Sequence, residues 1–191
     1  MAHSSRARIT SAVLTAAALL LAGCSAQEKA GEPSPTSTAP LPPSPTATPT
    51  ADPTADAKAA VLTAYQGMWD VTVKAYNQGS LDGVDNLETY TRDKALAGIK
   101  VAVAYYQKNN MVVPGRPQLS PVVQAVDLAS SPARATIRDC VDTAKFQPID
   151  KTTGQRSTTD GTVRHVMNSV AHRVDGHWLI SESAFDREQT C

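Results

Sequence analysis

The hydrophobic pattern of the chain changes once, near residue 110, from a helical period to an extended one. Before that point a first helix is predicted to begin at Pro53, because Asp52 is a favourable N-cap and proline fits the first helical position. Gly79 is expected to end this helix. Its apolar residues recur at steps of three and four, at Ala57, Ala60, Val61, Ala64, Met68, Val71 and Ala75.

A second amphipathic helix is predicted between Thr91, its expected N-cap, and the Asn109-Asn110 pair. Four of its residues share one face at helical spacing, namely Leu96, Ile99, Val103 and Tyr106. The segment 81–90 between the two helices is only weakly periodic. The first part of the folded region is therefore expected to be helical.

Beyond residue 110 the period falls to two, and β-branched and aromatic residues predict strands at 122–128, 133–146, 162–174 and 178–185. A turn at 150–154 separates the second strand from the third, and Asp175-Gly176 separates the third from the fourth. Asp-Gly between strand residues is a strong hairpin signal, so antiparallel neighbours are expected. Helices followed by such a meander predict one α+β domain over residues 53–191.

The first 23 residues have the composition of a secretory signal peptide. Arg6 and Arg8 precede an apolar stretch that is too short to span a bilayer as a permanent helix. The sequence Leu21-Ala22-Gly23-Cys24 resembles a lipobox, in which cleavage precedes the cysteine and its thiol receives a diacylglycerol. Acyl chains such as palmitate on Cys24 would hold the protein at the extracytoplasmic face of the cell membrane. We therefore predict an exported, lipid-anchored protein.

Residues 24–52 comprise this anchored cysteine and a segment rich in Ser, Thr and Pro that has almost no large apolar side chain. Such a segment cannot bury enough surface to offset its loss of conformational entropy. It is therefore predicted to be a disordered, partly polyproline spacer between the anchor and the domain.

Cysteine usage and charge agree with export. The chain has three cysteines, and assigning Cys24 to the lipid leaves Cys140 and Cys191. In an exported protein a disulfide is the default for such a pair, the alternative being two free thiols.

Loss of Arg6 and Arg8 with the signal peptide leaves 16 basic and 18 acidic side chains of the original 18 and 18. This balance gives no electrostatic reason to expect nucleic acid as a partner.

Helices followed by a curved antiparallel sheet resemble the cone-shaped nuclear-transport-factor-2-like (NTF2-like) fold of SnoaL-like and ketosteroid-isomerase-like proteins. Short stretches are similar to those of actinobacterial lipoproteins with such a domain, namely Gly115-Arg116-Pro117, Arg138-Asp139-Cys140-Val141-Asp142, Val174-Asp175-Gly176-His177-Trp178 and the terminal Cys191. The resemblance implies N-terminal helices packed on a curved four-stranded sheet around an open-ended pocket. It carries no activity with it.

Asp139 is the candidate catalytic residue. Strict alternation places it on the same strand face as Ala135, Ile137 and Val141, which is expected to be buried or to face the pocket. A carboxylate there would have a raised pKa and would be suited to act as a general base. The alternative is that Asp139 pairs with an arginine or caps a loop at the edge of the core.

Candidates for lining the pocket are Tyr65, Trp69, Tyr106, Asp139 and Trp178. Isomerase chemistry would also need an oxyanion partner, for which the tyrosines available are Tyr65, Tyr76, Tyr90, Tyr105 and Tyr106. Aromatic residues on helix faces more commonly belong to a hydrophobic core. Sequence spacing alone does not separate the two roles.

No metal site and no cofactor are predicted. His165 and His172 are seven residues apart in one strand, so an unbroken pleat would point them to opposite faces. His177 follows a turn and is expected to be exposed. The sequence contains no Gly-x-Ser-x-Gly elbow, no phosphate-binding Gly-Lys-Ser/Thr loop and no His-Glu-x-x-His motif.

Three functions remain as hypotheses. The first is a non-catalytic binding or scaffolding module, whose pocket or sheet face binds an envelope protein, a wall component or a small ligand. The second is an isomerase or dehydratase with Asp139 as base and a helix tyrosine as electrophile. The third, by analogy of fold alone, is a component of an envelope transfer or secretion machine. The spacer and the lack of a catalytic motif favour the first.

Overall fold

The computed structural model describes residues 52–157 and 161–191. The helices in this part are α1 (Pro53–Gln78), α2 (Leu87–Tyr90) and α3 (Asp93–Lys108), and the strands are β1 (Met111–Val112), β2 (Val122–Asp127), β3 (Arg134–Asp142), β4 (Ile149–Asp150), β5 (Arg164–Val174) and β6 (His177–Thr190). The predicted signal peptide (1–23), the anchor Cys24 and the spacer up to residue 51 lie outside the described residues. Within the described ranges, no helix is long and apolar enough to cross a membrane.

Helix α1 begins and ends where the sequence predicts. The Asp52 side chain accepts a hydrogen bond from the Thr54 N–H at 2.9 Å, which satisfies one of the free amides of the first turn. Gly79 adopts the left-handed conformation at φ 67° and donates its N–H to Ala75. A β-carbon at Gly79 would collide with the carbonyl oxygen of Met111, so the close approach of β1 also requires glycine here.

Helix α3 lacks the cap that the sequence suggests. Its N-cap residue is Arg92, which makes no side-chain capping bond. Thr91, the predicted cap, is buried, and its hydroxyl donates instead to the carbonyl of Leu87 at 2.7 Å. The prediction was wrong because the short helix α2 ends immediately before Thr91 and supplies a carbonyl acceptor for its hydroxyl.

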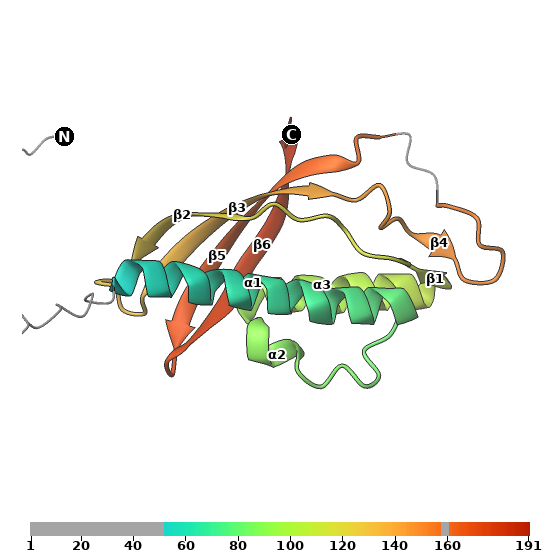
Figure 1. Ribbon diagram of the computed structural model, residues 1–191. Coiled ribbons are helices and arrows are strands. Elements are labelled where there is room, and N and C mark those ends of the chain that lie inside the picture. The colour runs from blue at the N-terminus through green and yellow to red at the C-terminus, as the bar shows by residue number, and fades with distance from the viewer. Residues whose placement is uncertain (1–51, 158–160) are drawn as a thin grey trace, which may run out of the picture. The chain divides into compact units, whose positions relative to one another are not determined.

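The large sheet has the order β2-β3-β5-β6, and every neighbouring pair is antiparallel. The sheet is twisted, and α1 and α3 lie against one of its faces (Figure 1). It is open, with β2 and β6 at its edges. The predicted α+β arrangement of N-terminal helices on a four-stranded antiparallel sheet is confirmed. The predicted Asp175-Gly176 hairpin is also confirmed, since both residues have positive φ, as a tight β-hairpin turn requires.

The sheet differs from the prediction beyond residue 142. Strand β3 ends at Asp142, and the chain turns so that the Phe146 N–H bonds to the carbonyl of Thr143 at 2.8 Å. The predicted strand 133–146 therefore ends four residues too late. The chain next forms β4, which pairs with β1 in a separate two-stranded sheet that the sequence pattern did not indicate. Two-residue strands are too short to show a period.

Strand β6 is longer than predicted and reaches Thr190. Its last residues are polar and exposed, so they lack the alternation that marks a half-buried strand. A disulfide joins Cys140 of β3 to Cys191, across Cα atoms 5.9 Å apart. The predicted pairing of these cysteines is confirmed. The bond holds the end of β6 to the sheet.

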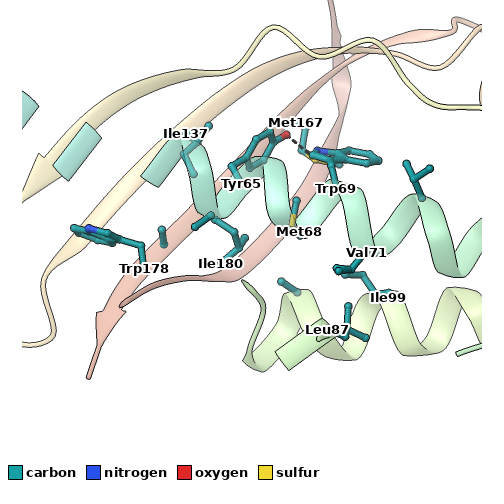
Figure 2. Packing of buried hydrophobic residues seen from close by; sticks show 14 of the residues in the cluster. Tyr65, Met68, Trp69, Val71, Leu87, Ile99, Ile137, Met167, Trp178 and Ile180 are labelled. Atoms are coloured by element: carbon teal, nitrogen blue, oxygen red, sulfur yellow. Dashed lines mark hydrogen bonds between the residues drawn. The ribbon is translucent and has the colours of Figure 1, made fainter. Parts of the chain in front are cut away.

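One part of the core lies between the N-terminal half of α1 and the middle of the sheet. Val61, Tyr65, Ile137 and Ile180 are buried there. Figure 2 shows Tyr65 and Ile137 facing one another, with Ile180 and Trp178 farther toward the β5–β6 hairpin. Gly67 lets α2 approach α1, because a β-carbon there would collide with the ring of Tyr90.

Candidate functional site

A pocket of about 740 Å³ lies between the C-terminal half of α1, helix α3, the turn after β3 and the ends of β5 and β6. Helix α1 contributes Met68, Trp69, Thr72 and Tyr76, which are spaced so that they share one helix face. Its remaining lining residues are Ala95, Gly98, Ile99, Tyr106, Val113, Thr143, Phe146, Gln147, Pro148, Gly161, Thr162, His165, Met167, Ser183, Ala184, Phe185 and Arg187.

Four aromatic rings in contact form much of the pocket wall. Phe146 stacks parallel to Tyr76, with ring centroids 6.1 Å apart, and meets Trp69 edge-on at 6.3 Å. Tyr106 of α3 meets Tyr76 edge-on at 5.1 Å. Such offset and edge-on contacts are favourable arrangements that stabilise the cluster beyond simple burial. The turn after β3 therefore matters for the site, because it brings Phe146 into the helix layer.

The opposite wall comes from the sheet. Ser183, Phe185 and Arg187 alternate along β6, so their side chains project from the same face of the strand. The pairing of Met167 with Phe185 continues this face onto β5. Phe185 is 42% exposed, although it lies opposite a largely buried helix layer. The pocket therefore opens to solvent beside Phe185.

Several hydroxyl groups of the pocket are already hydrogen-bonded within the chain. The Thr72 hydroxyl donates to the Met68 carbonyl at 2.7 Å, and the Thr143 hydroxyl donates to the Val163 carbonyl at 2.9 Å. The Ser183 hydroxyl shares a hydrogen bond with Ser169 at 2.9 Å. Burial raises the pKa of the Tyr76 hydroxyl and that of Tyr106 above the ordinary value, so both phenols stay neutral.

Among the described lining residues there is no aspartate and no glutamate. Arg187 is the lining residue with a permanent formal charge. Catalytic clefts usually contain titratable groups with perturbed pKa values, and the described lining of this pocket includes no carboxylate of that kind. The described lining combines an apolar interior with one cationic side chain and one histidine.

The carboxylate of Asp139 does not reach this pocket. As predicted, alternation buries it with Ala135, Ile137 and Val141, and it is 1% exposed. Its two oxygens, however, accept hydrogen bonds from the Tyr65 hydroxyl at 2.9 Å and from the Ser120 N–H at 2.6 Å. Burial raises its pKa, and these bonds oppose the rise. A general base must lie within hydrogen-bond reach of a ligand, which this placement does not provide.

The other predicted pocket residues divide between the pocket and the packed core. Trp69 and Tyr106 line the pocket, whereas Tyr65, Asp139 and Trp178 do not and are buried in the core instead. The alternation and helix-face arguments identified buried faces correctly. They did not show which part of a buried face remains uncovered, because that depends on where helices and turns end.

Trp69 stands at the boundary between the pocket and the core. Figure 2 shows its indole beside Tyr65 and Met167, whose sulfur lies 3.4 Å from the Tyr65 hydroxyl. Burial raises the pKa of Tyr65, and the nearby Trp69 side chain partly offsets this effect. The indole N–H itself is buried and has no well-formed hydrogen bond to the described residues. Trp69 therefore separates the polar Tyr65–Asp139 pair from the pocket.

The three histidines of the domain lie in different surroundings. His165 lines the pocket, and its ring packs against Phe185 with centroids 5.5 Å apart. His172 shares a hydrogen bond with the Ser181 hydroxyl at 2.9 Å, and His177 is exposed, as predicted. In residues 52–157 and 161–191, no group of three or more His, Cys, Asp or Glu side chains is arranged to hold a metal ion.

Sequence reasoning missed Phe146, Phe185 and Arg187 as pocket residues. The predicted strand 133–146 includes Phe146, whereas the turn at Thr143 directs its ring to Tyr76. The predicted fourth strand ends at Phe185, whereas β6 continues and contributes Arg187 to the pocket two residues later. The spacing of Phe185 and Arg187, two residues apart, could have indicated in the sequence that both lie on one face of a strand.

Comparisons with known proteins concern the fold alone. The intermembrane space region of the chloroplast protein ARC6 aligns with a TM-score of 0.43 and 12% identity, over 72% of this chain and 98% of that one. An NTF-2 like protein of unknown function from Shewanella oneidensis MR-1 aligns with a TM-score of 0.33 and 14% identity, over 65% and 97% of the two chains. A protein named Rd1NTF2_05, in a variant with five substitutions, aligns with a TM-score of 0.31 and 11% identity, over 64% and 96%.

Each of these TM-scores is below 0.5, so the alignments support no inference about activity, ligand or partner. No protein-family model matches the chain. No curated protein matches it in sequence. The printed names of two of the three structural neighbours contain NTF2 or NTF-2.

Proposed function

We propose that the protein is a lipid-anchored extracytoplasmic binding module, whose domain holds a small, largely apolar ligand without converting it. The pocket is the observation that carries this proposal. Its volume of about 740 Å³ is within the usual range of small-molecule sites, and four aromatic rings form much of its wall. We favour the pocket over the sheet face as the binding surface for this reason.

A binding role agrees better with the pocket chemistry than an isomerase role does. The buried acid that would serve as a base, Asp139, is engaged by Tyr65 and Ser120 outside the pocket. His165 is the histidine among the described lining residues, and its ring is packed against Phe185. A lone histidine without an acid–base partner among the described lining residues is poorly equipped for proton transfer.

The anchored location rests on the sequence. The lipobox-like Leu21-Ala22-Gly23-Cys24 supplies the attachment point, and the Pro/Ser/Thr-rich segment that follows supplies reach. The Cys140–Cys191 disulfide is the type of bond that persists outside the cytoplasm. Together they support a binding domain held near the outer surface of the membrane.

The pocket can be blocked at one position without disturbing the core. Gly98 of α3 lines the pocket, and a β-carbon there meets no atom within 4 Å. Leucine also favours a helix more than glycine does, so Gly98→Leu is expected to fold. Nile red, a neutral apolar dye, serves as the probe. The wild type is expected to bind it saturably with enhanced fluorescence, and Gly98→Leu to bind it about tenfold more weakly.

Ala97→Leu is the matched control, since Ala97 is an exposed neighbour on α3 that does not line the pocket. Its dye affinity is expected to equal that of the wild type. Equal loss in both variants, unchanged binding by Gly98→Leu, or no saturable binding by the wild type would each overturn the pocket as the binding site.

The anchor is tested separately in a bacterium that processes lipoproteins. Cys24→Ser removes the only predicted acyl acceptor and should shift the protein from the membrane fraction to the soluble or secreted fraction. Metabolic labelling with a palmitate analogue should mark the wild type alone. An unlabelled wild type, or a variant that remains in the membrane fraction, would contradict the proposed anchor.

A further inference from the structure

The pocket carries its charge at one place, at the solvent end of the wall formed by β6. Along this strand Ser183, Phe185 and Arg187 follow one another on the pocket face. Ser183 is partly buried, Phe185 is 42% exposed and Arg187 is exposed. The wall therefore changes from a hydroxyl at its inner end, through an aromatic ring, to a guanidinium at its outer end.

No carboxylate in the described part of the chain neutralises Arg187. The ion pairs in this part join Arg92 to Asp93, Lys94 to Glu182, Lys100 to Glu88 and Arg116 to Asp70. Neither of its sequence neighbours Asp186 and Glu188 forms an ion pair with it in the described part of the chain. Asp186 moreover accepts hydrogen bonds from the Gln189 side chain and the Glu188 N–H.

The inner part of the pocket offers the opposite chemistry. Met68, Trp69, Ile99, Phe146 and Met167 are all buried there and present carbon and sulfur surface. Arg187 lies four positions after Ser183, which is at most about 13 Å along the strand at roughly 3.3 Å per residue. A ligand that spans this distance would place its body on apolar side chains and one end at the guanidinium.

We propose that the pocket binds an amphipathic anion, a molecule with an elongated apolar body and a single carboxylate or comparable anionic group. The body lies against the buried apolar residues, and the anionic group pairs with Arg187. A guanidinium is well suited to this role, because its fork of N–H donors matches a carboxylate. His165, packed against Phe185, supplies a further ring nitrogen at the same end of the pocket. This inference rests on the proposed function and adds the class of ligand.

Three probes with the same ten-carbon chain test it, namely decanoate, 1-decanol and decylammonium. The full chain carrying Cys24→Ser is used, so that no acyl chain of its own competes and no detergent is needed. Calorimetric titration is expected to give decanoate an affinity about three- to fivefold above that of 1-decanol, the upper part of the range for an exposed ion pair. Decylammonium should bind most weakly. The preference for decanoate should shrink as salt is raised, because the arginine is exposed.

Arg187→Gln is expected to abolish the preference for decanoate while leaving the affinity for 1-decanol unchanged. Arg134→Gln is the matched control, since Arg134 is an exposed arginine on β3 outside the pocket lining. Equal binding of decanoate and 1-decanol, or a preference that survives Arg187→Gln, would overturn the anionic ligand and leave the apolar pocket standing. Failure of all three probes to bind the Cys24→Ser chain would overturn the proposed function as well.

Discussion

The two halves of α1 face two different interiors. The N-terminal half packs directly on the sheet, where Val61 and Tyr65 are buried against Ile137. The C-terminal half, from Met68 to Tyr76, faces the pocket instead. We call the first region the closed end and the second the open end. A single amphipathic helix therefore supplies both packed core and ligand-accessible wall.

The difference shows that the buried acid of this domain and its ligand-accessible space lie in different regions. The closed end contains the buried acid, but Asp139 is hydrogen-bonded to Tyr65 and Ser120. The open end contains the space and an exposed arginine, Arg187, that forms no ion pair in the described part of the chain. Buried polar groups must be satisfied from within the protein, which makes the Tyr65–Asp139 pair a structural feature. A group at the open end is free to meet a ligand.

Loss of the disulfide is expected to have the largest effect. The bond closes a loop of 51 residues, and on a chain-entropy account its removal in the double variant Cys140→Ser, Cys191→Ser costs about 4 kcal/mol of unfolding free energy. Urea denaturation measures this cost. Amide hydrogen exchange distinguishes the two ends. The amides of β6 beyond Ser183 should lose protection from exchange, while those in the N-terminal half of α1 keep it.

The expected loss of protection in β6 follows from the position of the disulfide. The disulfide joins the end of β6 to β3, and β6 supplies the outer wall of the open end. Equal loss of protection at both ends under native conditions would show that the two regions unfold as one unit. That result would remove the basis for treating them as independent.

A matched pair of cavity variants comes next in size. Ile137→Ala at the closed end should cost about 3 to 4 kcal/mol, because it leaves a void among fully buried neighbours. Ile99→Ala, on the pocket wall, should cost only about 2 kcal/mol, since it enlarges a space that already exists. Urea denaturation at one pH gives both values. Equal costs would contradict the distinction between a closed and an open end.

The closed end was largely predictable from the sequence. Steps of three and four identified the buried face of α1, and alternation along β3 buried Asp139 together with Ile137. Asp52 and Gly79 fixed the helix ends. These features are local, because a helix or strand period is set by the backbone geometry of that segment alone.

The open end was less predictable, because it is defined by where packing stops. Trp69 and Tyr106 were identified as lining residues, but Phe146 reaches the pocket through a turn that strand periodicity does not reveal. Arg187 lies in a polar stretch of β6 that pairs with β5 and is held at its end by the disulfide. Such positions depend on non-local pairing, which a single-sequence period does not contain.

The smallest expected effect concerns the protonation of Asp139. Burial raises its pKa in the folded protein, so the folded state holds this proton more tightly than the unfolded state. As pH rises from about 4 toward the raised pKa, folding stability should therefore fall by the contribution of this group, and the contribution should then level off. At lower pH both states are protonated, and the contribution to the pH dependence vanishes.

Asp139→Asn removes this titration while keeping a similar shape and hydrogen-bonding groups for Tyr65 and Ser120. Unfolding free energies measured in urea across the acidic range should show that the variant gains stability relative to the wild type as pH rises through the window. Asp85→Asn, at an exposed position, is the control and should follow the wild type. A variant that instead loses relative stability as pH rises would mean that the Tyr65 and Ser120 hydrogen bonds outweigh burial. Asp139 would then be a carboxylate that its hydrogen bonds stabilise in the ionised form. In that case the closed end would hold a buried negative charge of its own, whereas at the open end the negative charge is expected to come from the ligand.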